Sequence, residues 1–466
     1  MTGQQVSDPV EVGAAHAARW KILGFLGVAQ LMLILDVTVV AIALPHIQSD
    51  LGLSREALTW TVSAYTLTFG GLMLLGGRLA DIFGARRVLL IGLTLFTAAS
   101  LMAGFSTSAE TLLLGRVGQG AGAALLSPAA LSLVVSLFQG EERNRALGVW
   151  SALGGGGAAL GVLIGGILTA GPGWEWVFWV NVPIGLVILV ALTKMLPTGL
   201  TSLTDRRLDV LGAVLVTASS VVLICAFVGA GETGWFAART GVLVAASAIG
   251  FALFVAWQRT TATPLMDVRL LARRPVATGT FLIFVATALM VAVFFLGTFY
   301  FQHGLGYGPM RAGLLFLPVA LATMAGAQLT GRLLARLGVR TLAVSGLGLA
   351  AAGMAIPALS LHVGWALIGV VIAAAGTGAL FVVASATALG QVAPHEAGIA
   401  SGIVSTSHEL GASIGASVIS SVAAVSLTGA TNDGFTRGFA VAAIAAAASA
   451  LIALALTPGP QPAEQA

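Results

Sequence analysis

The sequence predicts an all-α integral membrane protein with fourteen spans, arranged as two six-helix bundles with two extra helices between them. Of the 466 residues, 58% are hydrophobic and only 9% are charged, against roughly 25% charged in an ordinary soluble domain. The mean hydropathy is +0.99. In addition, one loop signature occurs twice, as GRLADIFGARR from Gly77 and as GRLLARLGVR from Gly331, each time between two long apolar stretches. The repeat predicts a duplicated half in a membrane protein.

The expected spans are apolar segments long enough to cross a hydrocarbon layer of roughly 30 Å. They lie at 21–45, 57–80, 87–106, 109–138, 146–170, 176–196, 208–230, 237–257, 275–303, 312–334, 340–360, 363–388, 397–427 and 436–457. The two signature loops follow the second and the tenth of these segments. If two six-span halves followed each other directly, the two loops would be only six spans apart. Two further helices are therefore expected between the halves.

The basic residues predict the orientation of the chain. With the N-terminus in the cytoplasm, seventeen of the 22 basic residues fall on the inner side and one, Arg116, falls inside a span. The outer loops then hold only four, namely Arg55, Arg239, Arg311 and Arg437. This excess of positive charge on the inner side predicts cytoplasmic N- and C-termini in a plasma (inner) membrane.

The expected domain organisation follows from the repeat. Residues 1–20 form a cytoplasmic tail, 21–200 a six-helix bundle, 201–262 the two inserted helices, 263–457 the second bundle and 458–466 a second cytoplasmic tail. Two similar bundles can rock around a central site, which is how many transporters work. Transport is therefore the first functional hypothesis, and a single chain is expected to suffice.

The sequence lacks the motifs that identify several classes of enzyme and metalloprotein. There is no G-x-x-x-x-G-K-[ST] loop for ATP, no H-E-x-x-H and no G-x-S-x-G elbow, and Cys225 is the only cysteine. We therefore expect no enzymatic activity, no cofactor and no metal, and a stored ion gradient as the energy source. The basic residues are spread over short loops, which argues against nucleic acid as a partner. A membrane transferase and a receptor are the rival classes, the first without a visible His/Asp cluster and the second without an extramembrane domain.

Two acidic residues fall inside predicted spans. Asp36 lies in LMLILDVTVVAIALP and Glu409 lies in GIVSTSHELGASIG, one in each half. An ionisable group in the hydrocarbon layer costs about 2.5–3.5 kcal/mol, so it usually faces a cavity or a partner and marks an ion path. The alternative is a buried carboxylate that only stabilises packing. Arg116 cannot lose its charge and needs an acceptor, for which Asp36 is the candidate in the same half.

His408 precedes Glu409 and is a candidate proton relay. Because adjacent residues point to different helix faces, a packed polar residue is the alternative. Three glycines at four-residue spacing, Gly157, Gly161 and Gly165, predict a smooth face for tight helix contact.

The first signature loop is too short for a binding pocket and predicts a conformational gate. Gly77 and Gly84 permit close approach and a tight turn, Asp81 can cap a neighbouring helix start, and Arg86 and Arg87 hold the cytoplasmic face. A fixed loop charge is the alternative. The second copy has alanine where the first has Asp81, so any latch is asymmetric.

Taken together, these stretches resemble the major facilitator superfamily, specifically its fourteen-span drug:proton antiporter family. The similar motifs are LDVTVVAIALP (35–45), WTVSAYTL (60–67), the GRLADIFGARR loop, LLLGRVGQGAGAA (112–124), WEWVFWVNVPIG (174–185) and YFQHGLGYGPMRAG (300–313). The resemblance covers essentially the whole chain. It implies a gate role for Gly77, Asp81, Gly84 and Arg86, and a role in proton coupling for the arginine of the fourth helix, here Arg116.

The chain departs from the family pattern at three positions. Ala41 stands where asparagine is usual, and Glu175 stands in place of a basic residue. In the fifth helix, Val162 follows Gly161 where the antiporter motif has proline, so the kink that proline imposes is missing. This departure keeps an importer or symporter of the same fold open as the alternative.

The sequence therefore predicts a proton-coupled exporter of hydrophobic or amphiphilic small molecules, with protons and the lipid bilayer as its other partners. Asp36 and Arg116 are expected to form the main coupling pair, with Glu409 as a second protonation site or a contact for cationic substrate. A dedicated transporter of one metabolite is a further alternative. The expected substrate cavity between the bundles includes Tyr65, Gln119, Phe295, Tyr300 and His408; for the aromatic residues, packing toward lipid is the alternative.

Overall fold

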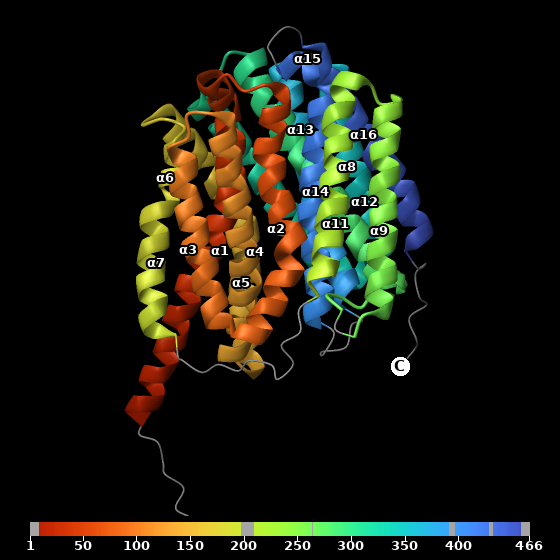
Figure 1. The fold of residues 1–466 in the computed structure, drawn as a ribbon. Helices are drawn as coiled ribbons and strands as arrows, with labels where there is room; N and C mark the ends of the chain where they lie inside the picture. Colours follow the sequence, from red (N-terminus) through yellow and green to blue (C-terminus); the bar gives the residue numbers. More distant parts are fainter. Residues whose placement is uncertain (1–8, 197–208, 263, 391–396, 428–431, 458–466) are drawn as a thin grey trace, which may run out of the picture.

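The computed structural model describes residues 9–196, 209–262, 264–390, 397–427 and 432–457 (Figure 1). Within these ranges the chain forms helices and no strand. The all-α prediction is therefore confirmed. The predicted C-terminal tail and residues 197–208, which join the first bundle to the inserted helices, lie outside the described residues, whereas residues 9–20 of the predicted N-terminal tail are helical.

The first half and the inserted pair contain nine helices among the described residues. They are α1 (Pro9–Leu51), α2 (Arg55–Phe83), α3 (Ala85–Gly104), α4 (Ala109–Leu137), α5 (Gly140–Ala170), α6 (Trp176–Trp179), α7 (Asn181–Met195), α8 (Val210–Thr233) and α9 (Ala238–Thr260). The helix starts have local causes. Ser54 accepts a hydrogen bond from the Ala57 backbone N–H at 3.1 Å and caps α2, and Ser108 begins α4 with a capping box.

The remaining part of the described chain begins with a one-turn helix. Its elements are α10 (Arg269–Ala272), α11 (Arg274–Phe299), the π-helical turn η1 (Tyr300–Gly304), α12 (Pro309–Leu359), α13 (Val363–Leu389), α14 (Ala397–Val422), α15 (Ala424–Leu427) and α16 (Asp433–Leu456).

Eleven helices of the described chain are long and apolar enough to cross a membrane. One of them, α12, contains two predicted spans, because its 51 residues reverse direction at Gly338, where the backbone is not helical. The predicted spans 146–170 and 397–427 correspond to α5 and α14. The arrangement is consistent with fourteen spans, and that exact number stays a prediction.

Both copies of the signature loop turn at the same glycine. Gly84 has φ +89° and separates α2 from α3, while its counterpart Gly338 has φ +73° and divides α12. Side chains strongly disfavour this left-handed region, which glycine adopts freely. The tight turn expected from the sequence is thus present twice, at equivalent positions of the repeat.

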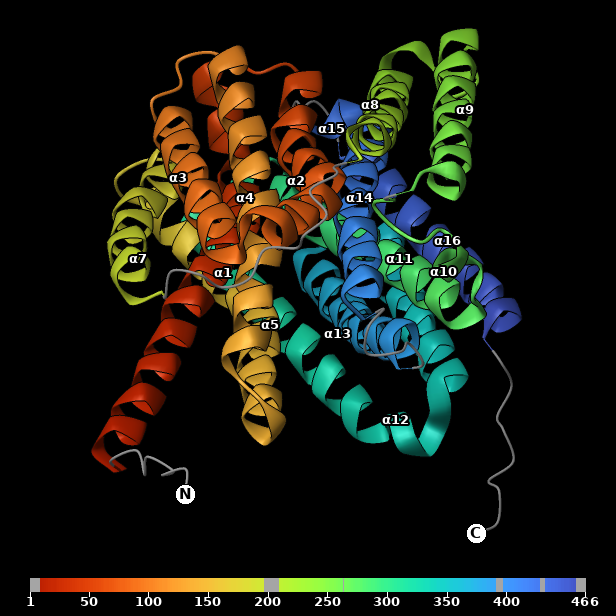
Figure 2. The ribbon, with the colours of Figure 1, turned by 60° about the horizontal axis from the view of Figure 1, so that its bottom comes forward.

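The helices of the two halves pack in the same pattern. In the first half α3 and α2 pack against α4, and α1 packs against α5; in the second, α12 packs against α13 and α11 against α14. The halves meet where α2 contacts α14 and where α5 contacts α12. The pair α8–α9 stands beside α14, at the edge of the molecule (Figure 2).

The spans run between two ends of the molecule. We call the end where α1 stops and α2 starts the Leu51 end, and the end where α2 stops and α3 starts the Gly84 end; they are the upper and lower ends in Figure 1. Several contacts between the halves lie toward the Leu51 end. There, the Gln302 amide donates to the Ile42 carbonyl oxygen at 2.8 Å, and an added Cβ on Gly166 of α5 would lie 3.1 Å from the Pro309 oxygen of α12.

Candidate functional site

A buried ion pair joins α1 and α4 inside the first half. Arg116 donates from Nη1 to Oδ2 of Asp36 at 2.5 Å, and each residue is 1% exposed. The structure therefore places in contact the two residues that the sequence proposed as partners. Burying both charges is costly unless further hydrogen bonds complete the pair.

Polar side chains from three more positions complete this pair. Gln119, one turn after Arg116 on α4, accepts from Arg116 Nη1 at 2.8 Å and donates to Asp36 Oδ1 at 2.8 Å. Its amide also donates to the Ser100 hydroxyl of α3 at 2.9 Å. Asn181, at the start of α7, donates to Asp36 Oδ1 at 3.3 Å. The Asp36 carboxylate thus accepts hydrogen bonds from three side chains on two other helices, α4 and α7.

The arginine is held from its other sides by α2 and by aromatic rings. Arg116 Nε donates to the Thr61 carbonyl oxygen at 2.8 Å. Its Cζ lies 4.4 Å from the ring centroid of Tyr65 and 6.0 Å from that of Phe178, distances at which a cation is attracted by an aromatic face. The Tyr65 hydroxyl donates to the Leu33 carbonyl oxygen at 3.4 Å. We call Asp36, Arg116, Gln119, Asn181 and Tyr65 the coupling network.

This arrangement determines the cost of a proton transfer. Protonating Asp36 in the observed geometry would leave the charge of Arg116 buried without its anion, and breaking a buried pair costs about 3–5 kcal/mol. Either charge of the pair is therefore costly to remove unless the other gains a new partner.

The three glycines of α5 position α1 in this network. A Cβ on Gly157 would lie 2.8 Å from Ile34, one on Gly161 would lie 1.8 Å from the Thr38 hydroxyl, and one on Gly165 would lie 3.0 Å from Val39 Cα. All three glycines therefore contact the segment of α1 that carries Asp36. Larger residues would push this segment away from α5.

Glu409 lies at the contact between the halves rather than inside one of them. It belongs to α14, is 7% exposed, and faces α2 where a Cβ on Gly70 would lie 2.5 Å from its own Cβ. His408 Nδ1 lies 3.1 Å from Glu409 Oε1, and the imidazole is 37% exposed. His408 also lies 5.8 Å from the Phe381 ring of α13. The structure thus brings Glu409 and His408 together, on a different helix pair from the one that holds Asp36.

A row of hydroxyl groups continues this contact toward the Leu51 end. Thr66 hydrogen-bonds Ser413, Thr59 hydrogen-bonds Ser420, and the hydroxyls of Ser63 and Ser417 are 3.4 Å apart. Sequence reasoning missed this row. The signal available was the helical spacing of 59, 63 and 66 on α2 and of 413, 417 and 420 on α14, which puts each set on one helix face.

The gate residues of the first signature loop lie at the Gly84 end. Arg86 donates from Nη2 to the Thr193 carbonyl oxygen of α7 at 2.8 Å. Asp81 and Arg87 are exposed, and a Cβ on Gly77 would lie 3.7 Å from Pro128. The Arg86 contact stays within the first half, so the role of this loop as a gate between the halves remains a prediction.

The residues proposed for the substrate cavity have three different surroundings. Tyr65 and Gln119 belong to the coupling network, and His408 lies beside Glu409. Phe295 and Tyr300 are each 2% exposed inside the second half, where Phe295 packs 5.0 Å from Phe299 and the Tyr300 hydroxyl donates to the Leu361 carbonyl oxygen. Their part in a shared cavity remains a prediction. Among the described residues there is no group of three or more His, Cys, Asp or Glu that could hold a metal ion.

Residues 26–416 match the family model described as Major Facilitator Superfamily. The puromycin resistance protein pur8 of Streptomyces alboniger is 38% identical over 459 residues, which cover 93% of this chain and 90% of that protein. The cephamycin export protein CmcT of Amycolatopsis lactamdurans is 37% identical over 84% of this chain and 83% of its own length. The lincomycin resistance protein of Streptomyces lincolnensis is 36% identical over 96% and 93%, respectively.

Solved structures share the fold at low sequence identity. A peptide transporter POT in complex with sulfate superposes with a TM-score of 0.67 at 18% identity, over 94% of each chain. A bacterial homologue of the human lysosomal transporter Spinster, in an inward-facing and unoccupied conformation, gives a TM-score of 0.64 at 16% identity, over 94% of this chain and 96% of that one. At these identities the likeness concerns the fold alone.

Proposed function

Because the chain belongs to the major facilitator superfamily, we propose that it exports hydrophobic or amphiphilic small molecules of the antibiotic class in exchange for protons. The relatives named above are antibiotic resistance and export proteins, which supports efflux by a secondary transporter. Family members and structural neighbours are transporters, in keeping with a chain that performs no chemical reaction. The coupled ion and the exact substrate belong to the proposal.

The coupling network is the observation that carries the proton part of the proposal. An aspartate and an arginine, each 1% exposed, lie in a helix bundle whose buried side chains are mostly apolar. Such a pair is expensive, and hydrophobic residues of similar volume are often as stable or more so. Its presence is explained by a task that needs a carboxylate whose partner can change.

The proposed cycle uses the two states of this pair. In the observed state Arg116 neutralises Asp36. In a second state Arg116 is drawn to another acceptor or is displaced by substrate, and Asp36 then takes up a proton because its charge is no longer compensated. Return to the first state expels the proton as Arg116 reoccupies the carboxylate. Each half-cycle therefore links a proton to the position of α4 relative to α1.

Glu409 has a different place in the proposal. It lies on the α2–α14 contact between the halves, so rocking of the bundles changes its surroundings directly. With the half-exposed His408 at 3.1 Å, we assign it a second protonation step or the binding of a positively charged substrate.

The proposed location is the plasma membrane, with the Gly84 end and both termini facing the cytoplasm. Lys21, Arg78, Arg86, Lys194 and Arg332 all lie at or near that end, as the positive-inside rule requires. A single chain contains both bundles, and we propose that it works as a monomer.

Import on the same fold is the second candidate function, and one residue favours it. Val162 stands where the antiporter pattern has proline, and its carbonyl oxygen faces Gly313 of α12 at the contact between the halves. A regular α5 at this point alters how the two halves separate.

The test uses the purified protein in liposomes that trap a pH-sensitive dye. With an imposed proton gradient, puromycin, lincomycin and a cephamycin are added separately, and proton and drug movement are recorded for each orientation of the gradient. Antiport predicts drug uptake into acidic liposomes together with loss of internal acidity. Drug movement in the same direction as the protons would establish symport, and drug movement unaffected by the gradient would reject proton coupling.

A further inference from the structure

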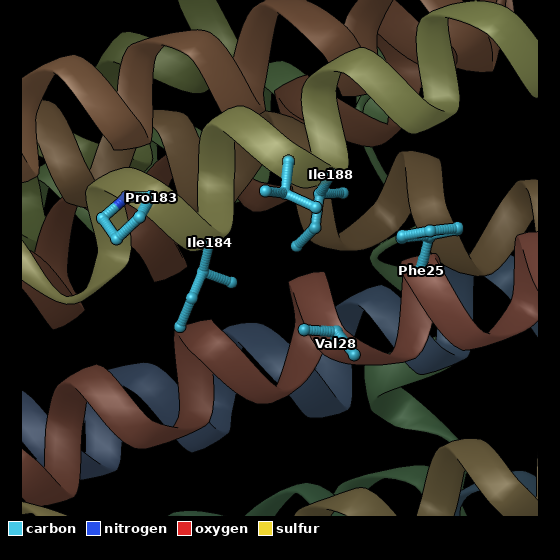
Figure 3. A pocket seen from close by; sticks show the side chains of 6 residues that line it. Phe25, Val28, Pro183, Ile184 and Ile188 are labelled. Carbon is cyan, nitrogen blue, oxygen red and sulfur yellow. The ribbon is translucent and has the colours of Figure 1, made fainter.

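An apolar groove of about 300 Å³ lies between α1 and α7. Side chains of both helices point into it (Figure 3), and its lining residues are Phe25, Val28, Pro183, Ile184, Val187 and Ile188. Val28 and Val187 are 44% and 62% exposed, and α7 forms the edge of the molecule in Figure 1. For two membrane-spanning helices, this outer face is surrounded by lipid.

The charges beside the groove are unusual for this chain. Among its 22 basic residues only two are lysines, Lys21 and Lys194, and they lie on the two helices that form the groove. Lys21 precedes Val28 by seven residues, and Lys194 follows Val187 by seven. Residues seven apart share a helix face and are about 10 Å apart along the axis. Both lysines are exposed, so they flank the groove on its open face, toward the Gly84 end.

The space between these lysines and the groove is open. A Cβ on Gly24, which is exposed and lies between Lys21 and Val28 on the same face of α1, would meet nothing within 4 Å. Neither lysine forms an ion pair with another residue that the structure describes. Two positive charges therefore lie at one end of the apolar groove, at the level where a membrane-spanning helix reaches the membrane surface.

We propose that this groove binds an anionic phospholipid, with one acyl chain along the apolar lining and the phosphate between Lys21 and Lys194. Lysine ammonium groups bind phosphate as point charges, and basic pockets between spanning helices hold anionic head groups. The lining offers no polar group to recognise a drug, and the two lysines repel lipophilic cations. The positive-inside rule explains two inner basic residues, but not their placement on both walls of one groove.

The groove is connected to the coupling network through α7. This helix begins at Asn181, which donates to Asp36, and near its end the Thr193 oxygen accepts from Arg86. A lipid packed against α7 between these two points would stabilise the position of the helix. The proposal concerns binding, however, and holds whether or not the transport mechanism above is correct.

The test compares the full-length protein in nanodiscs of phosphatidylcholine with and without phosphatidylglycerol. Acetylation of the two lysine amines is followed by mass spectrometry, and co-purified lipid is quantified. We expect phosphatidylglycerol to slow acetylation of both lysines several-fold. The Lys21→Gln and Lys194→Gln variants should each lower phosphatidylglycerol retention about fivefold, since a basic residue near an anionic surface contributes about 1 kcal/mol.

A filling variant with a matched control separates the groove from general surface charge. Gly24→Trp should displace the retained phosphatidylglycerol, whereas Gly241→Trp on α9, also at an exposed glycine with nothing within 4 Å, should not. If Gly24→Trp fails to fold, the two lysine variants decide. Equal acetylation in both membranes, or unchanged retention in the variants, would overturn the proposal. Displacement of the lipid by a drug of the transport panel would assign the groove to substrate instead.

Discussion

Asp36 and Glu409 are both buried acids of spanning helices, but their surroundings are opposite. Asp36 lies inside one half, where three side chains donate to it and an arginine balances its charge. Glu409 lies on the boundary between the halves, against a glycine and beside a half-exposed histidine. The comparison teaches that an acid inside a bundle depends on movements within that bundle, while an acid on the boundary depends on the movement of one bundle against the other.

The largest loss of stability is expected on removal of Arg116, the arginine partner that Asp36 has and that Glu409 lacks among the described residues. Arg116→Gln leaves Asp36 buried without a cation and should lower the free energy of unfolding by about 3–5 kcal/mol. Thermal unfolding in detergent measures this loss. Adding Asp36→Asn removes the uncompensated charge, so the double variant should recover most of the stability while proton-coupled transport stays absent. A double variant as unstable as Arg116→Gln alone would show that the pair is not the source of the cost.

A medium effect on stability and transport is expected where Gly70 of α2 contacts Glu409 of α14. In Gly70→Ala the new Cβ would lie 2.5 Å from Glu409 Cβ, so α2 and α14 must separate, and overpacking of this kind costs about 1–3 kcal/mol. We expect slower transport with an intact coupling network. Disulfide formation between Ser63→Cys and Ser417→Cys, in a Cys225→Ser background, reports the α2–α14 contact and should slow in the variant.

The matched control for this experiment is Gly402→Ala, also a glycine on the α2–α14 contact. There the nearest atom is the end of the flexible Leu74 side chain at 2.8 Å, which can move aside. Equal disulfide rates in Gly70→Ala and the unchanged chain would contradict a tight contact at Glu409.

The smallest effect concerns the two signature loops, which the repeat makes comparable. Gly84→Ala and Gly338→Ala place a side chain at φ +89° and +73°, which costs about 1–2 kcal/mol each. Chemical denaturation of each variant measures the loss, with Gly331→Ala as the control because its added Cβ would meet nothing within 4 Å. Similar losses at Gly84 and Gly338, and little at Gly331, are expected if both turns depend on left-handed glycine. A loss confined to Gly84 would show that the two copies no longer share this role.

Much of this architecture was predictable because the hydrocarbon layer restricts the chain to helices of known length. The turn at Gly84 was predictable because only glycine adopts a left-handed backbone freely. The partner of Arg116 was predictable because a buried cation needs an anion. The hydrogen bond from Asn181 to Asp36 was missed because the sequence around Asn181 does not indicate that it packs against α1. The hydroxyl row of α2 and α14 was missed because serine and threonine in a helix also bond their own backbone, as Thr59 does to the Arg55 carbonyl oxygen at 2.9 Å.

The placement of the cavity residues shows a second limit of sequence reasoning. Phe295 and Tyr300 are aromatic residues of an apolar span. A span that fills a core and a span that lines a cavity have the same amino-acid composition, so the sequence does not distinguish the two. Only the packing of Phe295 on Phe299 and of Tyr300 on Phe435 places them within the second half. The direction of a side chain around a helix with apolar residues on every face is not encoded in its local pattern.

The most direct test of the account compares Asp36→Asn and Glu409→Gln in liposomes, with Asp433→Asn, an exposed acid at the start of α16, as the control. Drug-driven proton flux and drug exchange without a gradient are measured for each. The account predicts that Asp36→Asn abolishes proton flux while exchange continues, and that Glu409→Gln keeps part of the flux. Full proton flux in Asp36→Asn would contradict the central role of the buried pair.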